Sequence, residues 1–144
     1  MIKELIDFKY IEYNELFIDN LLDKGNAEVF KGTYNEKDIA IKKYEYDEFN
    51  INEIIKELVI GSNTESERLM KTYGYSYDKE KEYLYLIMEY INSSDLGKYI
   101  SSYYDEDYEY CLSIETKLSI IKSVLKSIRD MWVEGIVHGD LKPL

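Results

Sequence analysis

The sequence predicts an α+β fold: an antiparallel sheet with one helix, followed by a helical segment. Several short stretches between residues 16 and 90 alternate apolar and polar side chains, which is typical of half-buried strands. Residues 47–60 and 114–132 instead repeat apolar side chains every three or four positions, the spacing of an amphipathic helix. Short polar turns join most of the strands, which indicates antiparallel pairing.

Length, charge and cysteine content limit the classes of function. The 144 residues suffice for one domain or for part of a larger one. A formal net charge of −11 disfavours binding to nucleic acid or to an anionic membrane, so we expect neither partner. The N-terminus lacks the pattern of a secretory signal. The single cysteine, Cys111, is typical of a reducing compartment, and we expect a cytoplasmic protein.

Three strands are expected first. Residues 16–22 lead into a turn at 23–26, and residues 28–34 alternate apolar and polar side chains. A polar connection at 35–38 then precedes a third strand at 39–42. The expected product is a three-stranded antiparallel meander.

The third strand carries a lysine with two interpretations. Side chains alternate along a strand, so Ala40 and Lys42 share one face while Ile39 and Ile41 share the other. A small residue and a lysine on one face can line a nucleotide cleft. An isolated strand lysine, by contrast, is most often solvated.

The helix at 47–60 offers a partner for that lysine. Glu53 and Glu57 are four residues apart and therefore lie on one helical face. They form a solvated acidic face, or one of them pairs with Lys42 and holds its ammonium over phosphate groups.

Two further strands complete a five-stranded sheet. They are expected at 69–75 and 83–90, with the charged turn 78–82 between them. A connector at 92–95 can cap a short helix at 96–102.

A long helix follows, from the N-cap Ser113 to the terminating glycine Gly135. Its apolar side chains form a stripe: Ile114, Leu118, Ile121, Leu125, Ile128 and Trp132. We expect this stripe to lie open, as a patch that either finds a partner or aggregates.

The last seven residues, 138–144, hold the only histidine and the only proline of the chain. A short polar run after the apolar pair Ile136 and Val137 is a poor core segment and is typical of an active-site loop.

These elements, in this order, resemble the first half of a eukaryotic-type protein kinase domain, in the style of the tyrosine-kinase-like group that includes receptor-interacting kinases and mixed-lineage kinase domain-like pseudokinases. The motifs that carry the resemblance are NELFIDNLLDKGNAEVFKGTY, IAIKKY, KTYGYSY, LIMEY and HGDLKP. The resemblance divides the chain into an N-terminal arm at 1–15, a small lobe and hinge at 16–91, and an incomplete start of the large lobe at 92–144.

The resemblance implies a set of ATP-binding positions. They are Gly25, Val29, Ala40, Lys42, Glu57, Met88, Glu89, Ile91 and Asp95. Lys42 would be the phosphate-binding lysine and Glu57 its helix partner, with Glu53 as second choice. Met88 would be the gatekeeper, and the backbone of residues 89–91 would be the hinge that reads adenine.

The remaining implied roles concern the nucleotide rings and the catalytic loop. Val29 and Ala40 would pack on adenine, and Asp95 would contact ribose. Asp140 would accept the proton of the attacking hydroxyl, and Lys142 would touch the transferring phosphate.

The chain departs from the family pattern in its glycine-rich turn. Asp23 replaces the first glycine, Gly25 keeps the second, and the third has no counterpart. Backbone amides of that turn cradle phosphate in the family, and Glu28 and Asp23 add negative charge beside it. We therefore expect ATP binding to be weak or lost.

The magnesium ligands expected after residue 144 are not among these residues, so Mg²⁺ would bind only in a complete parent. The complete parent would transfer the ATP γ-phosphate to protein Ser or Thr, and this chain alone would be inactive. Alternatively, the chain is a non-catalytic decoy or regulator that binds a full-length kinase through the 114–132 helix. Aminoglycoside and choline kinases share the His-Gly-Asp run, but the following Leu141-Lys142-Pro143 is unlike them.

Overall fold

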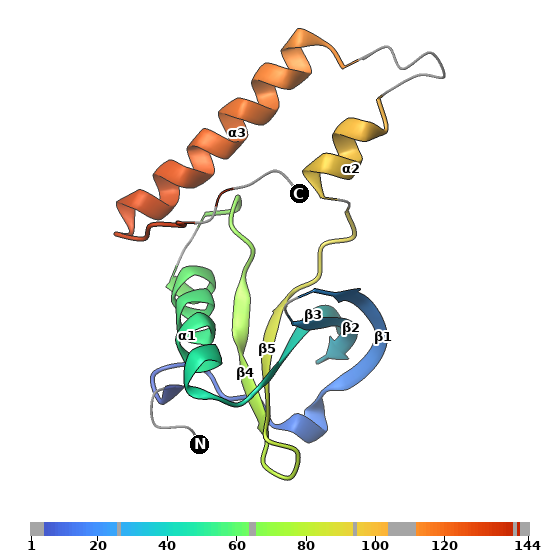
Figure 1. The fold of residues 1–144 in the computed structure, drawn as a ribbon, viewed down its shortest axis with the longest axis vertical. Helices are drawn as coiled ribbons and strands as arrows, with labels where there is room; N and C mark the ends of the chain where they lie inside the picture. The colour runs from blue at the N-terminus through green and yellow to red at the C-terminus, as the bar shows by residue number, and fades with distance from the viewer. Residues whose placement is uncertain are drawn as a thin grey trace. The chain divides into compact units, whose positions relative to one another are not determined.

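A computed structural model describes residues 5–25, 27–63, 66–93, 95–103, 112–139 and 141 (Figure 1). The chain divides into two compact units, Met1–Ile91 and Asn92–Leu144.

The first unit contains a five-stranded antiparallel sheet, as predicted. The strands are β1 (Phe17–Lys24), β2 (Glu28–Tyr34), β3 (Lys37–Glu45), β4 (Thr72–Asp78) and β5 (Tyr83–Glu89). Their spatial order is β1-β2-β3-β5-β4, so β3 and β5 are inner strands. Each of the four neighbouring pairs is antiparallel.

The β2–β3 hairpin is tighter than the sequence suggested. Its two turn residues, Asn35 and Glu36, have positive φ angles of 48° and 62°, as in a type I′ turn. Because Tyr34 and Lys37 pair directly beside this turn, β3 begins at Lys37 rather than at Ile39.

Helix α1 (Glu48–Asn63) lies beside β4, as Figure 1 shows, and closes one face of the sheet. The core on that face contains Ile54 and Leu58 of α1 together with Leu84 and Leu86 of β5. A second core on the opposite face includes Ile39, Ile41, Tyr85 and Ile87. The alternation along β3 places Ala40 and Lys42 on one face and Ile39 and Ile41 on the other, as predicted, and both faces carry a buried core.

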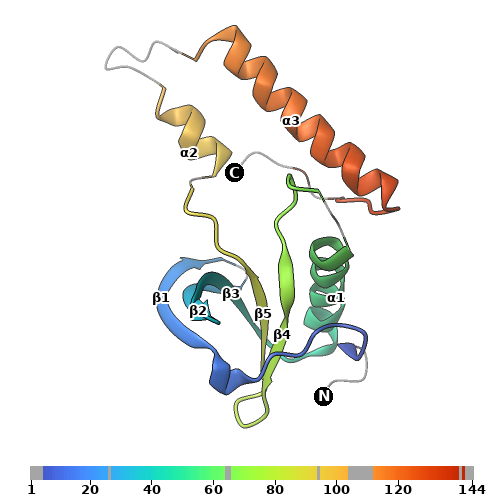
Figure 2. The same cartoon turned by 180° about the vertical axis from the view of Figure 1, so that it is seen from behind.

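The N-terminal segment belongs to this unit. Leu5 is fully buried in the core that contains α1 residues. The Tyr75 N–H donates to the Lys9 carbonyl at 3.0 Å, and the Ile11 N–H donates to the Tyr75 carbonyl at 2.8 Å. Tyr10 forms a parallel bridge with Tyr75, so this segment extends the sheet at β4, which it crosses in Figure 2. The expected arm at 1–15 thus contributes to the core within its described part.

The second unit contains α2 (Leu96–Ser101) and α3 (Ile114–Val133). As predicted, Ser113 caps α3: its Oγ accepts from the Thr116 N–H at 3.1 Å. At the other end the Gly135 and Ile136 N–H groups donate to the carbonyls of Trp132 and Met131, a Schellman motif. Gly135 has φ +73°, a conformation that favours glycine.

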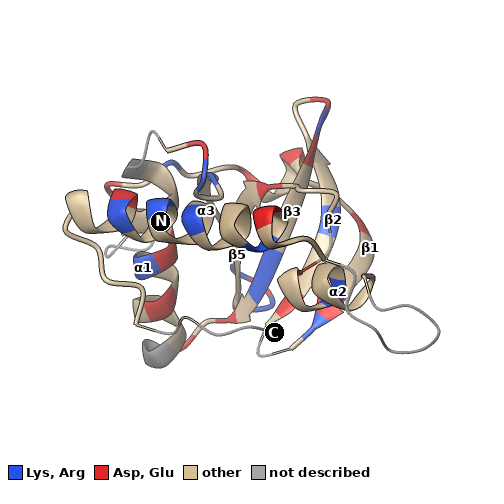
Figure 3. Ribbon diagram, turned by 90° about the horizontal axis from the view of Figure 1, so that it is seen from above, with Lys and Arg blue, Asp and Glu red and all other residues tan. Residues whose placement is uncertain are grey.

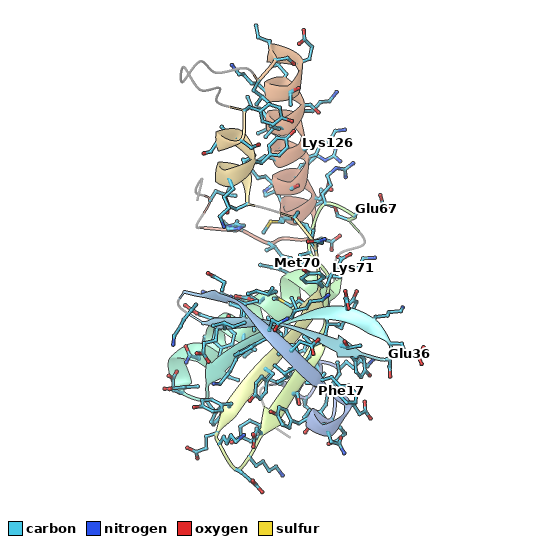
Figure 4. All side chains as sticks on the ribbon, turned by 90° about the vertical axis from the view of Figure 1, so that its right-hand side faces the viewer. Phe17, Glu36, Glu67, Met70, Lys71 and Lys126 are labelled. Carbon is cyan, nitrogen blue, oxygen red and sulfur yellow. The ribbon has the colours of Figure 1, made fainter. Side chains whose placement is uncertain are left out.

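Most of the apolar stripe of α3 is exposed. The exposed members are Ile114, Leu118, Ile121, Leu125 and Trp132. Lys126, labelled in Figure 4, belongs to the same helix. Within the described residues, no helix has the length and apolar character needed to cross a membrane.

Candidate functional site

The candidate site centres on an ion pair between β3 and α1. The Lys42 Nζ lies 2.5 Å from the Glu57 Oε1, and the two side chains are 26% and 33% exposed. Alternation along β3 directs Lys42 to the face that α1 covers, and the helical phase of α1 brings Glu57 to the same place. Of the two glutamates considered from the sequence, Glu57 is the one that accepts this hydrogen bond. Figure 3 shows that α1 carries both basic and acidic residues.

The sheet face around Lys42 is apolar. Val29 of β2 lies directly opposite Lys42, and Ala40 lies opposite Met88 of β5. Directly opposed residues of antiparallel strands point to the same face, so these side chains share one surface. Ala40 and Met88 are buried, and Val29 packs against the core they belong to. The structure thus brings together the lysine and the residues expected to contact adenine.

Tyr44 also belongs to this group, although no motif in the sequence indicated a role for it. Its Oη donates to the Glu57 Oε1 at 2.9 Å, the same oxygen that accepts from Lys42. Burial, followed by the negative charge of Glu57, raises the pKa of the Tyr44 hydroxyl. Extending the alternation by one step beyond Lys42 would have placed Tyr44 on the same face.

The expected hinge follows β5. The Glu89 N–H donates to the Lys71 carbonyl at 2.8 Å, and the Glu89 Oε2 accepts from the Lys71 N–H at 3.4 Å. Lys71, labelled in Figure 4, comes directly before β4. Ile91, the last residue of the expected hinge, is 53% exposed. These contacts fix the start of the hinge to the neighbouring strand.

The turn between β1 and β2 differs from a glycine-rich phosphate loop. Gly25 has open surroundings: a Cβ there would lie 3.5 Å from the Asp23 Oδ2, an ordinary contact. Next to the turn, the Glu28 Oε2 accepts from the Lys43 Nζ at 3.0 Å, and the pKa of the Glu28 carboxyl is lowered mainly by this bond. The negative charge of Glu28 is therefore retained and paired.

An open hollow of about 360 Å³ lies beside this turn. Its lining includes Gly25, Glu28 and Lys43, and it extends to Asn50 of α1 and Tyr83 of β5. None of Val29, Ala40, Lys42 and Met88 lines it. Tyr44, which shares the face of Lys42, also lines the hollow, so the hollow borders that face without reaching Ala40 or Met88.

Asp95 lies in the second unit and is the N-cap of α2. Its Oδ1 accepts from the Lys98 N–H at 2.7 Å, and its Oδ2 lies 3.0 Å from the Lys98 Nζ. The backbone N–H of Lys98, and then its ammonium, lower the pKa of the Asp95 carboxyl. Both oxygens of the residue expected to contact ribose are thus engaged within the helix.

The expected catalytic-loop residues Asp140 and Lys142 lie outside the described residues. Gly139, before them, has φ +74°, in the left-handed region that favours glycine. In the part of the chain that the structure describes, no group of three His, Cys, Asp or Glu side chains could hold a metal ion.

Comparisons with known proteins agree with this arrangement. The family model for the protein kinase domain matches residues 23–144. A probable LIM domain-containing serine/threonine-protein kinase of Dictyostelium discoideum is 30% identical over 99% of this chain and 22% of its own length. The L-type lectin-domain containing receptor kinase V.5 of Arabidopsis thaliana is 32% identical over 85% of this chain and 19% of its own length.

The chain therefore spans about a fifth of the length of these relatives. The family match covers most of the chain, including β2, β3, α1 and the segment that contains Asp140. The lysine of β3, the glutamate of α1 and the hinge after β5 follow one another along the chain within the matched residues. The chain belongs to the protein kinase domain family.

Proposed function

We propose that residues 16–91 form the ATP-binding small lobe of a serine/threonine protein kinase of the tyrosine-kinase-like group, and that the complete parent transfers the γ-phosphate of ATP to protein Ser or Thr. The observation that carries this proposal is the ion pair of Lys42 with Glu57, beside the apolar face of β3 and β5. A fixed ammonium can bind phosphate oxygens, and an apolar face can pack on a purine ring.

Each proposed contact follows from a position in the sheet. Val29, Ala40 and Met88 pack on adenine, whereas the Glu89 carbonyl and the backbone of Ile91 bond its edge. These five residues come from three strands and the hinge that follows β5. Lys42 then neutralises part of the phosphate charge.

The remaining roles belong to the complete kinase domain. In it Asp95 contacts ribose, Asp140 accepts the proton of the attacking hydroxyl and Lys142 contacts the transferring phosphate. Bound Mg²⁺ would neutralise charge on the phosphates in that parent. The 144 residues alone transfer no phosphate.

We expect the chain to bind ATP weakly. The β1–β2 turn has only Gly25 of the usual glycines, and Asp23 and Glu28 place negative charge near it. Phosphate groups carry the same sign as Asp23 and are disfavoured beside it, whereas the charge of Glu28 is paired with Lys43.

An NMR titration with millimolar ATP tests the site. We expect shifts at Ala40, Lys42 and Met88 that disappear in Lys42→Met. Lys43→Met is the matched control, because Lys43 bonds Glu28 instead of Glu57. Absence of shifts at millimolar ATP would refute the nucleotide site.

A thermal shift of several degrees with micromolar ATP and magnesium, lost in Lys42→Met, would contradict weak binding.

A phosphorylation assay tests the expected inactivity. Purified 1–144 should leave both itself and a casein-like substrate unphosphorylated. Phosphorylation that Asp140→Ala abolishes would show that these residues form a working active site.

A second candidate function is that of a decoy or regulator that binds a full-length kinase. The exposed stripe of α3 favours it, because Leu118, Leu125 and Trp132 are 60%, 61% and 72% exposed. Co-purification with a full-length kinase should be lost in Leu118→Glu and Leu125→Glu. It should persist in Ser123→Glu, an exposed position of the same helix. Equal binding by all three variants would exclude this surface.

The relatives' names favour protein kinases over aminoglycoside or choline kinases.

A further inference from the structure

Tyr44 contacts both members of the central ion pair through different parts of its side chain. Its hydroxyl donates to the Glu57 Oε1 at 2.9 Å. Its ring lies under the Lys42 ammonium, with 5.1 Å between the Nζ and the ring centroid. The hydroxyl therefore acts on the anion while the ring acts on the cation.

The surrounding core leaves the Tyr44 ring little freedom. Tyr44 is 5% exposed and belongs to the core that contains Ile54 and Leu58 of α1 and Leu84 of β5. Leu84 is also its direct partner in the β3–β5 pairing. Closely packed side chains keep their rotamers, so the hydroxyl is held at one position relative to the sheet.

The Glu57 carboxylate accepts two hydrogen bonds, from Lys42 and from Tyr44, and the two donors differ in mobility. Lys42 is a long side chain that is partly exposed and has to serve two partners if it also binds phosphate. Tyr44 has fewer rotatable side-chain bonds than Lys42 and is only 5% exposed, so its hydroxyl moves less than the ammonium. A glutamate that bonded only Lys42 would lose its anchor whenever the ammonium turned toward a ligand, whereas Glu57 keeps the bond from Tyr44.

We propose that Tyr44 is a positioning residue: its hydroxyl holds the Glu57 carboxylate, and with it α1, in the orientation that presents the Lys42 ammonium to phosphate. The expected effect on ATP binding rests on the proposed function. The expected effect on the Lys42–Glu57 ion pair does not depend on it. The two expectations can fail separately.

Tyr44→Phe removes the hydroxyl and retains the ring. A hydrogen bond to a charged group contributes enough that its loss corresponds to about tenfold or more in an equilibrium constant. We therefore expect the Kd for ATP, measured by NMR titration, to rise about tenfold in Tyr44→Phe. Tyr75→Phe is the matched control, since Tyr75 is buried in the same core and its hydroxyl has no hydrogen-bond partner among the described residues.

A double-mutant cycle separates positioning from packing. In the Glu57→Ala background, Tyr44→Phe should have no further effect on the ATP Kd, because the group through which Tyr44 acts is absent. Equal effects of Tyr44→Phe with and without Glu57 would overturn the proposal. An unchanged Kd in Tyr44→Phe would also overturn it, while leaving the ATP site in place.

Two readouts need no nucleotide. The ¹⁵N-labelled ammonium of Lys42 should give a signal in the free wild-type chain and in Tyr75→Phe, and the signal should weaken or vanish in Tyr44→Phe. In the wild-type chain the Tyr44 hydroxyl proton should exchange slowly with water, and the exchange should accelerate in Glu57→Ala. This second measurement remains available even if Tyr44→Phe does not fold.

These readouts distinguish the two failures. A Lys42 signal that is unchanged in Tyr44→Phe, or a hydroxyl exchange rate that is unchanged in Glu57→Ala, overturns the positioning role. If both change as expected but the wild-type chain shows no ATP shifts, the positioning role stands and the proposed function fails.

Discussion

The two units differ in how their apolar side chains are covered. In the first unit both faces of the sheet are closed, by α1 on one side and by the segment around Ile11 and Leu16 on the other. In the second unit Leu118, Leu125 and Trp132 of α3 are each more than half exposed. The first unit therefore carries its own core, whereas α3 is held mainly by bonds within the helix and at its ends.

This difference explains why the candidate site can be described in the first unit alone. The orientation of Lys42 depends on Glu57 and Tyr44, and all three are fixed by buried neighbours on β3 and α1. The contacts of Asp95 in the second unit are local, because both of its oxygens engage Lys98, three residues away. Stability measurements can test whether the units differ in this way.

Truncating a leucine in each unit should give the largest contrast. Leu58 of α1 is fully buried against the sheet, so Leu58→Ala should destabilise the chain by about 2–5 kcal/mol. Leu125 is 61% exposed, so Leu125→Ala should change stability by no more than about 0.5 kcal/mol. Urea unfolding followed by circular dichroism gives both values. Similar losses for the two variants would show that the stripe of α3 is covered in solution.

Gly61, near the end of α1, and Gly135, after α3, provide the next contrast. Close packing requires glycine at the first position, and backbone conformation favours it at the second. A methyl group on Gly61 would overlap the Thr72 side chain and lie 2.7 Å from the Thr72 nitrogen, so Gly61→Ala should separate α1 from β4. We expect a loss of about 1–3 kcal/mol, as for other overpacked sites. Gly135 has open space around it but φ +73°, so Gly135→Ala should cost roughly 1–2 kcal/mol of backbone strain.

Asparagine at the same positions identifies the cause. Asn tolerates the left-handed region, so Gly135→Asn should be milder than Gly135→Ala. At Gly61 the order should reverse, because the larger side chain overlaps Thr72 further. The same order at both positions would contradict the distinction between packing and backbone strain.

Local features of this fold were predictable from the sequence. The alternation in β2 and β3 and the N-cap Ser113 depend on residues close together in the chain. The start of β3 was misplaced because Asn35-Glu36 lacks the glycine that usually marks a type I′ turn.

Contacts between distant segments were harder to predict. Alternation placed Lys42 on a face but could not choose between Glu53 and Glu57, since that choice depends on how α1 is rotated on the sheet. Alternation could have placed Tyr44 on the Lys42 face, but its bond to Glu57 and the burial of Leu5 depend on neighbours from other parts of the chain. The resemblance to a family supplied the choice of Glu57, but it had no position for Tyr44.

The smallest expected effect concerns the cap of α2. The pKa of the Asp95 carboxyl is lowered in the fold, so its contribution to stability is complete above the ordinary Asp pKa of about 3.9. That contribution is lost as the pH falls through the lower folded-state pKa. The amide signal of Lys98 should therefore titrate with a midpoint below about 3.9, and Asp95→Asn should cap the helix without titrating. A midpoint at or above the ordinary value would mean that the Asp95 bond forms too rarely to hold α2. In that case even the local bonds that distinguish the second unit would be weaker than the structure shows.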